Sequence, residues 1–302
     1  MKQQTTAFIA LIGCPNVGKS SLLNRLVGEK VAIVSDKPQT TRNRVLGVCT
    51  DGDCQLVLMD TPGAHQPRTQ LGNFMMKTVG RTLDDVDAAV LVVQAGESIR
   101  EQEQRLLQRL QRNQLPTLLL INKIDALEDK RALLPCISMW QQAYPFDDII
   151  PVSVLTGDGM DTVLQKLQGY AQPAPHFFPD DVATDQPERV LAAELVREQM
   201  LNLLDQEVPH GVAVTVEHFS EREDAAEQII DIDVVILCER DGHKGIIIGK
   251  GGKMLKTIGT GARKQMEELF GAKVNLQCWV KVKEDWRNRG GLLHTLGFTE
   301  KN

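Results

Sequence analysis

The fold of this 302-residue chain is decided by the stretch Gly13-Cys14-Pro15-Asn16-Val17-Gly18-Lys19-Ser20. It matches the pattern G-x-x-x-x-G-K-[ST] without a mismatch and lies between an apolar run and a helix-like stretch, as a phosphate-binding loop does. Glycines allow such a loop to wrap closely around phosphates, and the N-terminus of the following helix attracts anions. Lys19 is then expected to reach the β- and γ-phosphates of a nucleotide, and Ser20 to bind Mg²⁺. The loop predicts phosphate binding but does not specify the base.

Short apolar runs alternate with amphipathic stretches over the first 170 residues. This alternation predicts an α/β fold with a mostly parallel sheet and helices on both faces. The predicted strands are Ala7–Ile12, Arg44–Thr50, Gln55–Met59, Ala88–Val93, Thr117–Ile121 and Ile149–Val152. The predicted helices are Lys19–Val27, Leu71–Leu83, Arg100–Arg112, Lys130–Tyr144 and Met160–Tyr170.

The periodicity breaks after Tyr170 in a proline-rich stretch, which indicates a linker between two domains. We therefore predict a first domain at 1–171, a linker at 172–187 and a second domain at 188–302. The second domain reads as a small α+β unit, in which a glycine-rich turn precedes the second helix. Its predicted elements are a helix at Glu188–Leu204, strands at Val212–His218 and Ile229–Cys238, a helix at Met254–Leu269 and a strand at Ala272–Val282.

Asn122-Lys123-Ile124-Asp125 specifies the base of the nucleotide. This segment follows an apolar strand, so its side chains emerge at the edge of the sheet where such folds bind ligands. A carboxylate there accepts hydrogen bonds from N1–H and the N2 amino group of guanine, and adenine lacks these donors. The predicted nucleotide is therefore GTP or GDP.

Two further segments are placed to contact the γ-phosphate and Mg²⁺. Asp60-Thr61-Pro62-Gly63 ends another apolar strand, so Asp60 is expected to hold Mg²⁺ through water and the Gly63 N–H to contact the γ-phosphate. The polar segment 37–42 precedes the second strand, where a mobile switch would lie. A threonine hydroxyl from it could complete Mg²⁺ coordination only when the γ-phosphate is present. Chemistry alone does not separate Thr40 from Thr41.

Near the C-terminus, the turn Gly249-Lys250-Gly251-Gly252 stands directly before a predicted helix. Turns of the G-x-x-G type clamp the backbone of about four nucleotides in KH domains. Lys250 and Lys253 add positive charge, and residues 240–302 carry 13 Lys and Arg against 6 Asp and Glu. A flexible turn or helix cap would show the same four residues, but the surrounding order of elements and the local charge favour an RNA-binding KH domain.

Together these motifs resemble the Era family of bacterial GTPases, within the larger class that includes Ras. The resemblance is carried by Pro15–Asn24, Gln39–Arg42, the D-T-P-G and N-K-I-D motifs, Thr184–Arg189, and the G-K-G-G turn with its downstream W-V-K-V-K. It implies a Ras-like P-loop GTPase domain followed by a type II KH domain. It also implies that Thr41 is the switch threonine, and that the chain binds 16S ribosomal RNA near its 3′ end in assembly of the 30S subunit.

The motifs and the resemblance together predict four sets of site residues. Catalysis is assigned to Lys19, Thr41, Asp60 and Gly63, and Mg²⁺ binding to Ser20, Thr41 and Asp60. GTP binding is assigned to Gly13, Asn16, Val17, Gly18, Lys19, Ser20, Ser21, Asp60, Thr61, Pro62, Gly63, Asn122, Lys123, Asp125, Ser153 and Val154. RNA binding is assigned to Gly249, Lys250, Gly251, Gly252 and Lys253.

Three positions depart from the family pattern, which has Arg at Cys14, a larger aliphatic residue at Ala64 and Ala at Val154. The pattern has a backbone N–H of the Ser153-Val154 segment donating to the guanine carbonyl, and a backbone donor survives the change of side chain. Ras-like enzymes orient the attacking water with a glutamine where this chain has Ala64. Intrinsic hydrolysis is therefore expected to be slow. Asn16 has two readings that stay open: it helps hold a potassium ion that replaces an arginine finger, or it stabilises the loop.

The amino-acid composition bears on where in the cell the protein is found. No apolar run reaches the ~18 residues of a membrane span, and Ala7–Ile12 is too short for a signal peptide. The six cysteines form no C-x-x-C pair, so we interpret them as small buried hydrophobes in a reducing compartment. We expect the protein to be a monomer in the cytoplasm. The family resemblance implies that a fraction of the molecules also associates with the membrane surface. The alternatives are a related GTPase of tRNA modification or metal transport, and a non-hydrolysing RNA-binding protein.

Overall fold

The computed structural model describes residues 3–222 and 228–298 and divides into two compact units. The first unit consists of residues 3–32, Thr41–Pro67 and Met75–Asp185. The second combines the described residues from Gln186 onward with two short segments from the N-terminal half, Ile33–Thr40 and Arg68–Phe74. The predicted boundaries assigned both segments to the first domain.

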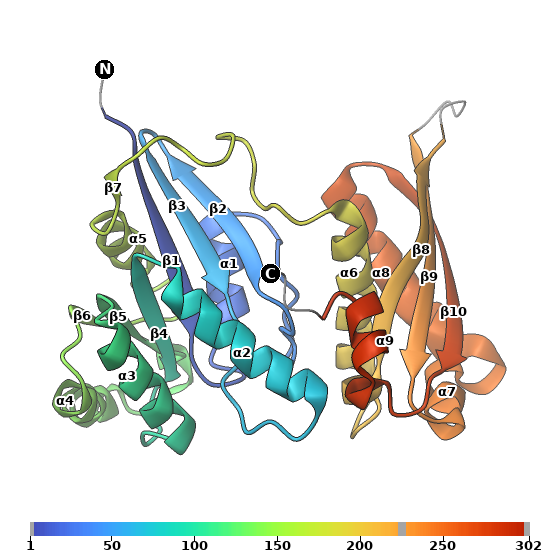
Figure 1. Ribbon diagram of the computed structural model, residues 1–302, viewed down its shortest axis with the longest axis horizontal. Coiled ribbons are helices and arrows are strands. Elements are labelled where there is room, and N and C mark those ends of the chain that lie inside the picture. The colour runs from blue at the N-terminus through green and yellow to red at the C-terminus, as the bar shows by residue number, and fades with distance from the viewer. Residues whose placement is uncertain (1–2, 223–227, 299–302) are drawn as a thin grey trace. The chain divides into compact units, whose positions relative to one another are not determined.

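The first unit is built on a sheet with the strand order β2-β3-β1-β4-β5-β6 (Figure 1). Only β2 runs antiparallel to its neighbour on this path, so the mostly parallel α/β sheet is confirmed. A two-residue strand, β7, pairs with the start of β1. The strands are β1 (Thr5–Ile12), β2 (Val45–Asp51), β3 (Cys54–Asp60), β4 (Ala88–Gln94), β5 (Thr117–Asn122), β6 (Asp148–Pro151) and β7 (Gln172–Pro173).

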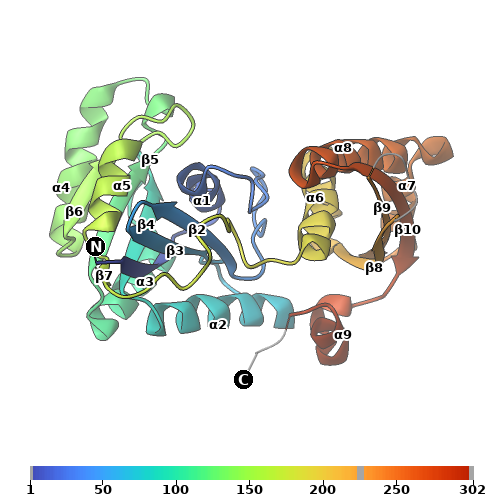
Figure 2. The same ribbon diagram turned by 90° about the horizontal axis from the view of Figure 1, so that it is seen from above.

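Helices cover both faces of this sheet because side chains along each strand alternate between two cores (Figure 2). Ile9 and Leu11 of β1 belong to the core formed with α1 and α5. Ala10 and Ile12 belong to the core formed with α2, α3 and α4. These helices are α1 (Lys19–Val27), α2 (Gln70–Asp84), α3 (Glu101–Asn113), α4 (Leu133–Ala143) and α5 (Met160–Gln168). The loops that follow β1, β3, β5 and β6 therefore meet at the carboxyl edge of the sheet, where ligands bind in such folds.

The second unit has a three-stranded sheet in the order β10-β9-β8, with β9 and β10 parallel. Helices α6, α7 and α8 share one apolar core with this sheet, and Figure 2 shows them beside its strands. The elements are α6 (Glu188–Leu203), β8 (Ala213–Glu221), β9 (Ile229–Cys238), α7 (Asp241–Ile248), α8 (Lys253–Phe270), β10 (Lys273–Val282) and α9 (Gly290–Thr295). The second, smaller α+β domain is confirmed.

Helix α7 differs from the prediction, in which only a glycine-rich turn lies between Cys238 and Met254. The helix has eight residues, two of them glycine, and is too short for a clear helical period. Burial decides its conformation, because Ile247 is fully buried in the core of the second unit. The glycine turn therefore joins two helices.

The predicted burial of the cysteines holds for Cys14, Cys136 and Cys238, whereas Cys49, Cys54 and Cys278 are only partly buried. All six cysteines are free, and the described residues contain no cluster of His, Cys, Asp and Glu suited to a metal ion. No helix within residues 3–222 and 228–298 is both long and apolar enough to cross a membrane.

Candidate nucleotide and RNA sites

The phosphate-binding loop joins β1 to α1 in a backbone conformation that demands glycine. Gly13 has φ 147° and Gly18 has φ 102°, a region that L side chains rarely adopt. A Cβ on Gly13 would lie 2.3 Å from the Val92 carbonyl oxygen, and a Cβ on Gly18 2.3 Å from Asn122 Nδ2. Both glycines are thus required by the protein that surrounds the loop. Asn16 also has a positive φ, 64°.

Lys19 is the buried cation of this loop, with 6% of its surface exposed. Its ammonium donates to the carbonyl oxygens of Gly13 (3.2 Å) and Cys14 (2.9 Å). Burial lowers the pKa of Lys19, and the negative charge of Asp60 opposes that shift. Burial likewise raises the pKa of Asp60, and the charge of Lys19 opposes it. Each charge therefore offsets part of the desolvation cost of the other.

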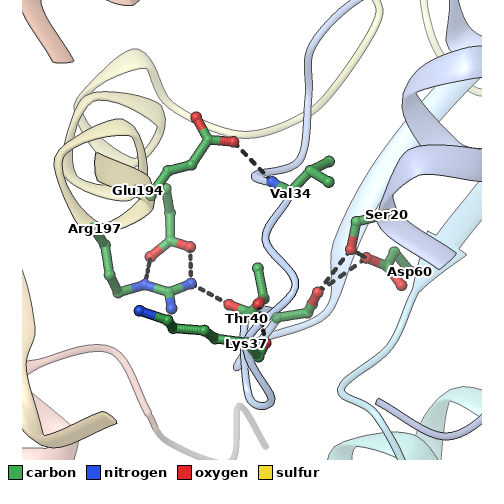
Figure 3. Close-up of polar contacts among 9 residues, drawn as sticks. Ser20, Val34, Lys37, Thr40, Asp60, Glu194 and Arg197 are labelled. Atoms are coloured by element: carbon green, nitrogen blue, oxygen red, sulfur yellow. Dashed lines mark hydrogen bonds and ion pairs between the residues drawn. The ribbon is translucent and has the colours of Figure 1, made fainter. Parts of the chain in front are cut away.

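The three predicted Mg²⁺ ligands converge. Ser20 Oγ donates to Asp60 Oδ2 at 2.6 Å (Figure 3). Thr41 Oγ1 lies 3.2 Å from the same carboxylate oxygen and 2.9 Å from Ser20 Oγ. Asp60 Oδ1 is buried without a hydrogen-bond partner. This oxygen and the two hydroxyl groups are hard donors of the kind that Mg²⁺ prefers, so the residues fit the ion. Thr40 does not compete, because its hydroxyl donates to the Lys37 carbonyl at 2.6 Å.

The segment after β3 is fixed against the phosphate-binding loop. The Thr61 hydroxyl donates to the Leu11 carbonyl at 2.8 Å, and the Ala64 N–H donates to the Gly13 carbonyl at 3.0 Å. A Cβ on Gly63 would lie 2.7 Å from Pro15 Cα, so only glycine fits there. The buried Ala64 methyl group has no polar atom with which to orient water.

His65 lies beside this segment and belongs to none of the sequence motifs. Its Nδ1 is 2.9 Å from the Gly63 carbonyl oxygen, and its Nε2 is buried with no partner among the described residues. The signal in the sequence is its position, two residues after the glycine whose N–H is predicted to contact the γ-phosphate.

The predicted guanine pocket lies at the ends of β5 and β6. The Asn122 side chain donates to the Val17 carbonyl at 2.8 Å and so ties this pocket to the phosphate-binding loop. Ser153 Oγ donates to Asp125 Oδ1 at 2.5 Å, which orients the carboxylate expected to read guanine. Lys123 has φ 64°, and its ammonium donates to Gln94 Oε1 at 3.2 Å.

The backbone of Ser153 and Val154 is engaged differently from the expectation. The Ser153 N–H donates to the Asp158 carbonyl at 3.0 Å, and the Val154 N–H donates to Asn122 Oδ1 at 3.0 Å. Both donors predicted for the guanine carbonyl therefore have acceptors within the protein. A contact from Val154 to guanine requires that its bond to Asn122 be shared or exchanged, and it stays a proposal.

Cys14 contributes packing to the nucleotide site. Its side chain is buried, and burial raises the pKa of the thiol to about 11, with the nearby Glu103 charge adding to the shift. A thiol with that pKa is neutral at physiological pH and a poor ligand or nucleophile.

The predicted RNA-binding turn lies between α7 and α8. Gly249, Gly251 and Gly252 all have positive φ, between 61° and 76°. A Cβ on Gly249 would lie 2.7 Å from that of Met254, whereas nothing lies within 4 Å of a Cβ on Gly251 or Gly252. The side chains of Lys250 and Lys253 are exposed on either side of these open glycines. This arrangement leaves a phosphate group free access to the turn.

Comparison with known proteins identifies both units. Residues 8–123 match the model of a family described as 50S ribosome-binding GTPase, and residues 207–287 match that of the KH domain. GTPase Era of Clostridioides difficile is 46% identical over 296 residues, which cover 98% of this chain and 99% of that protein. GTPase Era of Ruminiclostridium cellulolyticum is 47% identical over 298 residues, which cover 98% and 99%. This chain belongs to the Era family of GTPases.

Solved structures of Era agree with this assignment over the same length. A variant of Aquifex aeolicus Era bound to GDP.AlF4⁻ matches with a TM-score of 0.94 and 35% identity, covering 98% of this chain and 100% of that one. Era in complex with MgGDPNP and nucleotides 1506–1542 of 16S ribosomal RNA matches with the same values. As a member of the Era family, this chain is a GTPase, with a P-loop domain and a KH domain.

Proposed function

We propose that this protein is a Mg²⁺-dependent GTP switch that binds the 3′ region of 16S ribosomal RNA and assists assembly of the 30S subunit. The observation that carries the proposal is the convergence of Ser20, Thr41 and Asp60 in a chain that also presents an open glycine turn flanked by lysines. An Era structure that matches nearly the whole chain contains both MgGDPNP and 16S nucleotides.

The residues of the first unit divide the work of binding and hydrolysis. The N–H groups of the phosphate-binding loop and the buried Lys19 ammonium hold the β- and γ-phosphates. Ser20, Thr41 and Asp60 would hold Mg²⁺, which neutralises phosphate charge when bound. The Gly63 N–H, kept close to the loop by its neighbours, contacts the γ-phosphate. Asp125, oriented by Ser153, selects guanine.

Hydrolysis by this arrangement is slow without an activator. Ala64 supplies no group to orient the attacking water, and the charge of an arginine finger is absent from the predicted site residues. In this proposal Asn16 helps a potassium ion to supply that charge. The support is that Asn16 lies in the loop between Gly13 and Gly18 and has a positive φ.

The KH domain supplies the RNA-binding part of the switch. The open turn at Gly251 and Gly252 admits the RNA backbone, and Lys250 and Lys253 attract its phosphates. The protein acts as a monomer in the cytoplasm, where small subunits are assembled. We further propose that a fraction of the protein molecules associates peripherally with the membrane surface.

RNA crosslinked to the protein tests the proposal. We expect the sequenced fragments to come from the 3′ end of 16S RNA in both nucleotide states, with yields that differ between GDPNP and GDP. A parallel single-turnover assay should show conversion of GTP to GDP. Fragments spread over tRNA would support the tRNA-modification alternative, and an absence of hydrolysis would support the non-hydrolysing one.

A further inference from the structure

The second unit contains a segment that belongs by sequence to the nucleotide switch. Residues Ile33–Thr40 precede the predicted Mg²⁺ ligand Thr41, yet they form one compact unit with the KH elements. Ile33 is buried in the same apolar core as α6. The switch segment, as we call Ile33–Thr40, is therefore packed by residues outside the GTPase motifs.

Two consecutive side chains of α6 hold the backbone of the switch segment at both ends. Near its start, the Val34 N–H donates to Glu198 Oε1 at 2.8 Å. At its end, the Arg197 guanidinium donates to the Thr40 carbonyl (Figure 3). Both bonds are made to backbone atoms, so they fix the path of the segment whatever its side chains are.

A third contact comes from the switch segment itself. The Lys37 ammonium donates to the Leu204 carbonyl, at the end of α6, and lies 3.3 Å from Asp205 Oδ1. The carboxylate of Asp205 is almost fully exposed, so that ion pair adds little stability. The bond from Lys37 to the carbonyl is the directional part of this contact.

The side chains of Arg197 and Glu198 are buried charges that need hydrogen-bond partners. Arg197 is 2% exposed and Glu198 is 3% exposed, and a buried charge is costly unless it is paired and hydrogen-bonded. Glu194 pairs with Arg197 through Nε at 2.9 Å, and Glu198 Oε2 accepts a bond from Gln265 of α8 at 2.8 Å. Each buried group also makes one bond to the backbone of the switch segment, Arg197 to the Thr40 carbonyl and Glu198 to the Val34 N–H.

We infer that Arg197 and Glu198 are positioning residues for GTP binding, which hold the switch segment so that Thr41 can join Mg²⁺. The Thr40 carbonyl belongs to the peptide group that joins Thr40 to Thr41. The Thr41 hydroxyl already lies beside Ser20 and Asp60. The inference rests on the proposed role of Thr41. Ordering this loop costs conformational entropy, and α6 offsets that cost before the nucleotide arrives.

The contacts from α6 should affect the affinity for GTP and not the affinity for GDP. The Thr41 hydroxyl completes Mg²⁺ coordination only when a γ-phosphate is present, so a held switch segment favours GTP specifically. GDP contacts the phosphate-binding loop and the guanine pocket, neither of which includes the switch segment. Loss of the α6 contacts should therefore weaken the GTP complex and leave the GDP complex almost unchanged.

The test measures GDPNP and GDP affinities of the full-length chain by titration calorimetry with Mg²⁺. For Arg197→Met we expect GDPNP affinity to fall about tenfold, as for loss of one charge-assisted hydrogen bond, with GDP affinity within about twofold of the parent. Lys37→Ala should act in the same direction more weakly, and it removes no side chain from the KH core. Arg263→Met is the matched control, because Arg263 donates to Glu267 within α8 at 2.9 Å.

A double-mutant cycle with Thr41→Ala separates the possible failures. If Arg197 acts through Thr41, Arg197→Met should add nothing in the Thr41→Ala background, and chelation of Mg²⁺ should abolish the difference between parent and variant. Thr41→Ala binding GDPNP normally would overturn the proposed Mg²⁺ ligand. A loss for Thr41→Ala but none for folded Arg197→Met and Lys37→Ala, or equal losses for GDP and GDPNP, would overturn the inference alone.

Discussion

The two glycine-rich turns of this molecule both suit phosphates, but different constraints require their glycines. In the GTPase unit, a Cβ on Gly13 or Gly18 would collide with protein atoms at 2.3 Å. In the KH unit, a Cβ on Gly251 or Gly252 would meet nothing within 4 Å. The first turn is a packed part of its domain, whereas the second is packed only at Gly249 and is open at Gly251 and Gly252. A packed site can enclose a small nucleotide, and an open one can admit a polymer.

The largest effect is expected from Lys19→Ala, which removes the buried cation of the packed turn. GTP affinity should fall by more than about a thousandfold, because several charge-assisted bonds of ~1.5–3 kcal/mol each are lost. Binding of a short single-stranded RNA to the KH domain should persist. Fluorescence titration with a labelled GTP analogue and RNA anisotropy measure the two activities. Retained GTP binding would contradict the assignment of the phosphate site.

Asp125→Asn should change the base that the packed site selects. The carboxylate is oriented by Ser153 at 2.5 Å, and its loss removes two hydrogen bonds to guanine. The free energy of GTP binding should become less favourable by several kcal/mol, at ~1.5–3 kcal/mol for each lost hydrogen bond to a charged group. Xanthosine triphosphate should be favoured instead, because its N1–H and C2 carbonyl suit a carboxamide. Competition between the two nucleotides is the measurement, and normal GTP binding would show that the guanine pocket is misplaced.

A matched pair of glycine substitutions tests the contrast directly. Gly18→Ala combines a φ of 102° with a collision against Asn122, and should lower the free energy of unfolding of its unit by about 2–4 kcal/mol. Gly251→Ala meets only the cost of a left-handed conformation, about 1 kcal/mol. Thermal melting followed by circular dichroism compares them. Equal losses would mean that the two turns are equally packed.

The double variant Lys250→Asp with Gly251→Asp places two negative charges on the open turn. RNA affinity should fall at least tenfold (about 1.4 kcal/mol), because phosphate contacts dominate binding, and its salt dependence should weaken. Basal GTP hydrolysis should change little, since neither residue belongs to the nucleotide site. Anisotropy at two salt concentrations measures the loss, with melting curves as the control for folding. Unchanged affinity and salt slope in a folded variant would remove the RNA clamp.

The smallest effect concerns Asn16 in the packed turn. GTP hydrolysis should be faster in potassium than in sodium at equal ionic strength, because a bound potassium ion supplies charge that Ala64 and its neighbours do not. Asn16→Ala should abolish the difference between the salts. Rates of phosphate release in the two salts check this, and equal rates in the parent would leave RNA or the ribosome as the source of acceleration.

Most of the nucleotide site was predictable because its motifs are short, contiguous and placed at the ends of buried strands. Parallel strands bring those ends to one edge, so local patterns were enough to predict that Lys19, Asp60 and Asn122 lie together. Most strand bounds were also close, as for β4, predicted at Ala88–Val93 and found at Ala88–Gln94. Helix α7 was not predictable, because packing of Ile247 outweighs a weak local preference.

The sequence by itself determined that this protein has a guanine nucleotide site and a KH turn, since each depends on residues adjacent in the chain. Only the tertiary structure showed that Thr41 rather than Thr40 turns toward Ser20 and Asp60. It alone showed that Arg197 and Glu198 bind backbone atoms 157 and 164 residues away. The physical reason is that neighbouring residues specify the helix on which a charged side chain stands, whereas folding brings its distant hydrogen-bond partner within reach.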